Sequence, residues 1–180
     1  MKLIITLYLA LVLTGVLFGC STAANHVSSN APNQLPQLPL RYYNTQSDLA
    51  FFLPASWLGY SVMDQQWEGT TYSAAEDKTV VVGHGPMIIL RHPQWKASAP
   101  YQDIPILVFT RRQWDALNHG KLWPTCYVGG TMDEICHNSQ YVFAISSRFN
   151  AADGVNGWKE AGNAVNQNIM ANVASDLYPH

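Results

Sequence analysis

Charged residues are scarce in this sequence, and they form no cluster of one sign. Of its 180 residues, 10 are Lys or Arg and 12 are Asp or Glu, which gives a formal net charge of −2. A protein that binds nucleic acid through its phosphates needs a basic patch or stripe, and none is present. The composition therefore argues against a nucleic-acid partner.

Long apolar runs are also absent once the first 18 residues are passed. The longest that remain, Thr79–Val82 and Ile104–Phe109, have the length of β-strands and are too short to cross a membrane as helices. Any attachment to a membrane therefore has to come from the N-terminal segment.

The sequence lacks the short motifs that are typical of serine hydrolases, nucleotide-binding proteins and zinc proteases. It has no G-x-S-x-G serine elbow, no P-loop lysine and no His-Glu-x-x-His zinc pair. His84 and His92 stand at either end of Gly85–Arg91, and an extended chain would separate them by about 26 Å, too far to share a metal. We therefore predict no metal, no cofactor and no catalytic activity, with an enzyme using His84 or His92 kept as the alternative.

The N-terminal segment has the layout of an export signal. Lys2 precedes an apolar run from Leu3 to Phe18, which ends at Gly19-Cys20. The sequence Leu17-Phe18-Gly19-Cys20 resembles the lipobox of bacterial lipoproteins. That resemblance implies a signal peptide over 1–19, acyl chains such as palmitate on Cys20, and anchoring through this lipid in the bacterial cell envelope, at the periplasmic face of the outer membrane.

A tether and one folded domain are predicted to follow the lipidated cysteine. Residues 20–39 are rich in Pro, Asn, Ser and Ala and carry no charge, a composition that cannot bury enough apolar area to fold. Residues 40–180 have the length and apolar content of a single domain. Within it, Cys126 and Cys136 form an even pair in an oxidising compartment, so we predict a disulfide between them.

The domain alternates short strand patterns with two helix patterns. Strands are expected over 40–43, 49–53, 59–63, 78–82, 87–91, 104–109 and 140–147. Gly83–Pro86 is expected to form a turn between two of them, and Lys121–Asn138 to be irregular. Thr110 is expected to cap a short helix that ends before Gly120.

A long C-terminal helix is expected to end near Leu177, with five residues on one face at spacings of three and four. These are Trp158, Ala161, Val165, Ile169 and Val173. The order of elements predicts an α+β fold with a largely antiparallel sheet, one short mid-chain helix and one long terminal helix. The segments Tyr43-Asn44, Leu49–Pro54, Ser56-Trp57 and Gly59-Tyr60 resemble the opening of PsbP/Mog1-like domains, which implies the same kind of fold and no functional residue.

Tryptophans are the remaining candidates for a binding surface. Trp57, Trp114 and Trp158 have apolar neighbours and are expected in the core, whereas Trp95 and Trp123 lie in loops beside prolines. We predict Trp95 and Trp123 as ligand contacts of a non-catalytic binding or accessory domain, whose partner is an envelope protein or a glycan. A structural component of the envelope without a specific ligand is a further alternative.

Overall fold

The computed structural model describes residues 39–126, 131–150 and 155–177, with side chains to residue 172, and all of them belong to one compact unit, Pro36–His180. The elements, in chain order, are β1 Leu40–Asn44, β2 Leu49–Leu53, the 3₁₀ turn Ala55–Trp57, β3 Ser61–Ser73, β4 Lys78–Arg91, β5 Ile104–Thr110, α1 Arg111–Asn118, β6 Trp123–Pro124, β7 Met132–His137, β8 Tyr141–Ser146 and α2 Trp158–Leu177.

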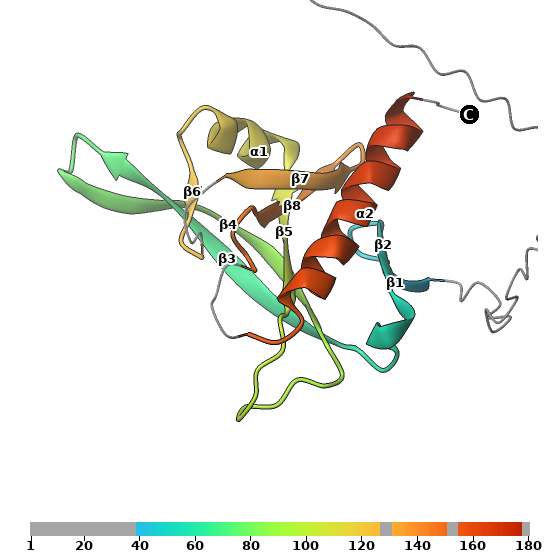
Figure 1. Ribbon diagram of the computed structural model, residues 1–180. Helices are drawn as coiled ribbons and strands as arrows, with labels where there is room; N and C mark the ends of the chain where they lie inside the picture. The colour runs from blue at the N-terminus through green and yellow to red at the C-terminus, as the bar shows by residue number, and fades with distance from the viewer. Residues whose placement is uncertain (1–38, 127–130, 151–154, 178–180) are drawn as a thin grey trace, which may run out of the picture. The chain divides into compact units, whose positions relative to one another are not determined.

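A six-stranded sheet with order β6-β3-β4-β5-β8-β7 forms the centre of this unit, and every neighbouring pair is antiparallel. Strands β1 and β2 form a separate hairpin. Figure 1 shows α2 and this hairpin on one side of the sheet and α1 on another. The predicted α+β fold, with its antiparallel sheet, short helix and long terminal helix, is confirmed.

The central strands bury both of their faces, because alternate side chains enter two different cores. In β5, Ile104, Ile106 and Val108 face the core beneath α2 and the β1–β2 hairpin, while Leu107 and Phe109 face the core beside α1. This explains why β5 has a continuous apolar sequence rather than an alternating one. Its predicted position inside the sheet is confirmed.

Helix α1 begins as the sequence predicts. The Thr110 hydroxyl accepts a hydrogen bond from the Gln113 N–H, and the Gln113 side chain accepts one from the Thr110 N–H, which completes a capping box. Gly120 follows the helix with φ 66°, a left-handed conformation that glycine adopts without strain.

The largest error in the predicted elements is the turn at Gly83–Pro86. Residues 78–91 form one continuous strand, and the real turn lies at residues 74–77, where Asp77 has φ 51°. Glycine is needed at 83 and 85 because a side chain would collide with packed neighbours. A Cβ on Gly85 would lie 2.7 Å from the Trp67 ring, and one on Gly83 would lie 3.1 Å from Leu122. They are packing positions in a strand, and the predicted turn is wrong.

Two further expectations are corrected. The segment 121–138, expected to be irregular, contains β6 and the edge strand β7, whose register shifts between Glu134 and Cys136. Trp158, expected in the core, is 45% exposed at the start of α2, whereas Ala161 and Val165 are buried as expected, together with Ala164. Val173, also expected on the buried face, lies outside the residues whose side chains are described.

Candidate functional site

An open cleft of about 630 Å³ lies between the β1–β2 turn and the face of the sheet. Its floor comes from β3, β4 and β5, and its walls come from the β1–β2 turn, the start of α1 and Tyr141 of β8. Five carboxamide side chains line it, together with one carboxylate and one imidazole. The carboxamide cleft, as we call it, has these seven residues: Asn44, Gln46, Gln65, Gln66, Gln113, Asp64 and His84.

The cleft exists because β4 and β5 separate. Their pairing ends at Met87–Leu107, and beyond it Pro86 has no N–H to offer the neighbouring strand. Two side chains supply the missing hydrogen bonds. The Trp67 indole N–H donates to the Val108 carbonyl at 3.0 Å, and the Gln113 amide donates to the His84 carbonyl at 2.9 Å.

The turn that forms the opposite wall is held by Asn44. Its side-chain oxygen accepts hydrogen bonds from the N–H groups of Gln46 and Ser47, each at 3.0 Å. Its amide nitrogen donates to the Tyr42 hydroxyl, also at 3.0 Å. Asn44 and Gln113 therefore build the cleft, which leaves Gln46, Gln65 and Gln66 as the carboxamides that can turn to a ligand.

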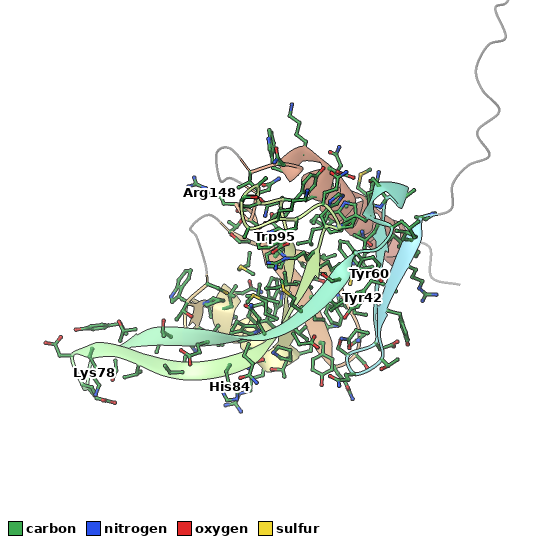
Figure 2. The ribbon with its side chains drawn as sticks, turned by 90° about the horizontal axis from the view of Figure 1, so that it is seen from below. Tyr42, Tyr60, Lys78, His84, Trp95 and Arg148 are labelled. Atoms are coloured by element: carbon green, nitrogen blue, oxygen red, sulfur yellow. The ribbon has the colours of Figure 1, made fainter. Side chains whose placement is uncertain are left out.

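His84 lies where the cleft meets a second hollow. Its cross-strand neighbour on β3 is Glu68, and both residues line this hollow with Val81, Thr125 and Cys126. In Figure 2, His84 lies part-way along the β3–β4 hairpin, whose tip is marked by Lys78. The pairing of His84 with Glu68 was not predicted from the sequence, because His84 was expected in a turn.

The histidine, carboxylate and thiol in this hollow do not form an activated nucleophile. Cys126 is exposed as a residue, but partial desolvation of its sulfur raises the pKa of the thiol, which disfavours the reactive thiolate. Within the described residues no side-chain hydrogen bond orients the His84 ring. No group of His, Cys, Asp and Glu side chains there has the geometry of a metal site. The prediction that the protein needs no metal stays a prediction.

His92 occupies a closed aromatic cluster away from the cleft. Its side chain is 3% exposed, stacks on Tyr101 with 3.9 Å between ring centroids, and meets Trp57 edge-on. Its Nδ1 accepts the N–H of Gln94 at 3.1 Å, while Nε2 is buried without a partner among the described residues. Packed between these rings, the imidazole presents almost no surface to a substrate.

A carboxylate completes the cluster. Glu160 of α2 accepts hydrogen bonds from the hydroxyls of Tyr101, at 3.0 Å, and of Ser56. Burial lowers the pKa of His92, against weaker opposing effects of Glu160 and the Ser56 backbone. The cluster joins the loop after β4 to the start of α2, which is a structural role. The structure thus places the two histidines in unrelated surroundings.

The two tryptophans predicted as ligand contacts also differ. The guanidinium of Arg91 covers one face of the half-buried Trp95, 3.8 Å from the ring centroid, and Arg91 is itself paired with Asp103 at 2.7 Å. Trp95 is not among the residues that line the cleft. Trp123 is exposed on β6, where it pairs with Thr70 of β3. Only Trp123 is placed to extend a binding surface.

The predicted disulfide is not formed in the structure, where Cys126 and Cys136 are separate thiols. Cys126 is exposed beside the hollow at His84, whereas Cys136 packs against the core beneath α2. Burial, with a smaller effect of Glu134, raises the pKa of Cys136 to about 11. The two sulfurs belong to different surroundings, which their closeness in sequence did not reveal.

The predicted lipidation site, Cys20, lies outside the described residues, as do the predicted signal peptide and nearly all of the tether. Among the residues that are described, no helix is long and apolar enough to span a bilayer. Comparison with known proteins found no matching family model, no similar curated protein and no similar solved structure. The resemblances to bacterial lipoproteins and to PsbP/Mog1-like domains therefore stay predictions.

Proposed function

We propose that this chain is a lipid-anchored lipoprotein of the bacterial cell envelope whose α+β domain binds a polar partner without catalysing a reaction. The observation that carries this proposal is the carboxamide cleft. Its size lies within the range of about 300–1,000 Å³ that is usual for ligand sites. Its side chains are mostly neutral groups that both donate and accept hydrogen bonds, so they can bind a polar ligand through its own donors and acceptors.

The chemistry of the cleft supports binding over catalysis. A hydrolase needs a nucleophile or a water held by an oriented base, and the described side chains around the cleft include no such hydrogen-bonded pair. His92, the other histidine considered for catalysis, is enclosed by Trp57 and Tyr101. Binding is therefore the function that the side chains of the cleft can perform by themselves, whereas hydrolysis would require a nucleophile or an oriented base.

Photocrosslinking in intact cells tests the binding function. A benzophenone amino acid replaces Gln66, in the cleft, and in a control chain it replaces Asn163, which is exposed on α2. We expect a discrete crosslinked species from position 66 and none from position 163. Equal labelling at both positions, or none at either, would show that the cleft has no partner.

Labelling with radioactive palmitate tests the anchor separately. The wild-type chain should incorporate the label and sediment with membranes, and Cys20→Ala should do neither. Incorporation by Cys20→Ala at the wild-type level would remove the lipoprotein part of the proposal and leave the binding part to the crosslinking result.

A further inference from the structure

The cleft does not stop at the split between β4 and β5, because its floor continues along one face of the β3–β4 hairpin. Asp64, Gln66 and Glu68 alternate along β3 and share this face. Their register partners on β4 are Ile88, Pro86 and His84, in that order. Gln66 and His84 line both the cleft and the second hollow, so the two depressions are continuous.

The same face extends to the exposed part of the hairpin, which we call the arm and define as Thr70–Ser73 of β3 with Lys78–Val82 of β4. The register of β3 and β4 shifts between Gly69 and Thr70, and beyond this shift Thr70 and Tyr72 continue along β3, with Val81 opposite Thr70. Across the other edge of β3, Thr70 pairs with Trp123. Asp64, Gln66, Glu68, Thr70, Tyr72, Val81, His84 and Trp123 together form one surface, the trough.

Two aromatic rings mark the outer end of the trough. Trp123 is 48% exposed and Tyr72 is 63% exposed. The Tyr72 hydroxyl donates a hydrogen bond to Asp77 in the turn of the hairpin, which ties the ring to the arm. Both rings therefore keep part of their apolar surface exposed, which a ligand lying across them can contact.

The charges of the trough decide which ligand it suits. Its acidic side chains are those of Asp64 and Glu68, and it contains no Lys or Arg, so an anionic polymer would find no cationic side chain to pair with. Neutral amides beside exposed aromatic rings match a ligand with many hydroxyl groups and flat apolar faces.

We infer that the trough binds an uncharged glycan strand, with hydroxyl groups hydrogen-bonded by Gln66 and its neighbours and sugar rings stacked on Trp123 and Tyr72. The extended chain from Asp64 to Tyr72 spans about 27 Å, enough for several linked sugars. This inference rests on the proposed binding function and adds the class of ligand and a second subsite to it.

Calorimetric titration of the full chain with uncharged hexasaccharides tests the inference. The probes are β-linked hexamers of N-acetylglucosamine and of glucose, and the variants are Trp123→Ala and the matched control Trp158→Ala, whose tryptophan is similarly exposed on α2. We expect at least one hexamer to bind, about tenfold weaker binding by Trp123→Ala, and unchanged binding by Trp158→Ala. Thermal unfolding confirms that both variants are folded.

Three results would overturn the inference: no binding of either hexamer, an equal loss in both variants, or tighter binding of a Lys-rich peptide than of the sugars. The last would assign the carboxylates of the trough to a cationic peptide. If crosslinking from position 66 still captures a partner while the hexamers fail, the binding function stands and only the glycan is excluded. If neither the crosslinking nor the hexamer titration detects a ligand, the proposed binding function is wrong together with the glycan inference.

Discussion

The two ends of β4 belong to one strand and behave as two different environments. At the end nearest the loop, Ile88 and Leu90 enter one core while Met87 and Ile89 enter the other. At the arm end, Val81 and Val82 are exposed although their side chains are equally apolar. Each end has its histidine, with His84 exposed on the arm side and His92 enclosed just after the buried end.

The difference comes from the neighbours of the strand and not from its own sequence. Strand β5 pairs with β4 only between Met87 and Leu90. The core beside α1 continues a little further, because Trp67 and Leu122 pack over Gly85 and Gly83. Towards the arm, β4 pairs only with β3 among the described strands, and its Val81 and Val82 side chains are left 60% and 47% exposed. An apolar run that stays exposed in this way is a feature of association surfaces.

The sharpest test of the comparison is a pair of truncations on this strand. Leu90→Ala removes a fully buried side chain and should lower the free energy of unfolding by about 2–5 kcal/mol. Val81→Ala removes one that is 60% exposed and should change it by less than about 0.5 kcal/mol. Urea unfolding measures both. Similar losses would mean that the arm is buried against something in solution.

The buried His92 should also make the free energy of unfolding depend on pH, an effect smaller than that of the Leu90 truncation. The pKa of His92 is lowered in the folded state, so the unfolded chain binds the proton first as the pH falls. Its contribution is therefore complete above pH 6.5, the ordinary value, and is lost progressively below it. His92→Phe, which keeps a ring but cannot titrate, should flatten the fall in unfolding free energy between pH 7 and pH 5. Parallel curves for the two proteins would contradict this.

The last and smallest expected difference is in the rates at which the two thiols react with an alkylating reagent. Alkylation of the folded protein at pH 8 should label exposed Cys126 at least about tenfold faster than Cys136, whose pKa of about 11 leaves little thiolate. Peptide mapping after timed quenching gives both rates. If neither cysteine reacts until a reductant is added, the disulfide predicted from the sequence forms after all.

Local signals in the sequence predicted the local elements well. The Thr110 cap, the continuous apolar run of β5 and the period of α2 each depend on residues within one or two turns or strands. The α+β fold followed from the order of these elements. Strand β7 was missed because Met132–His137 has no alternating pattern, and its register shift at Glu134 lets an irregular sequence pair at the edge of the sheet.

The candidate site was much less predictable than the fold. Gly83 and Gly85 read as turn residues, since nothing local reveals that Leu122 and Trp67 pack on them. With a turn predicted at Gly83–Pro86, the sequence could not indicate a cleft beside His84, because that cleft requires these residues to be part of β4. Of the predicted contacts, Trp123 lies on the trough, while Trp95 is covered by Arg91, a neighbour that sequence spacing does not identify as a stacking partner.

By itself, then, the sequence determined the class of fold, the ends of α1, the interior place of β5 and the expectation of a lipidated Cys20 in the envelope. These rest on periodicity, capping and motif, which are properties of adjacent residues. Only the tertiary structure decided which apolar residues stay exposed, in which surroundings Cys126 and Cys136 lie as separate thiols, and how residues of β1, β3, β4 and α1 meet in one cleft. Those outcomes depend on contacts between residues far apart in the chain, and the place where β4 and β5 separate is fixed by Trp67, Pro86 and Gln113 together.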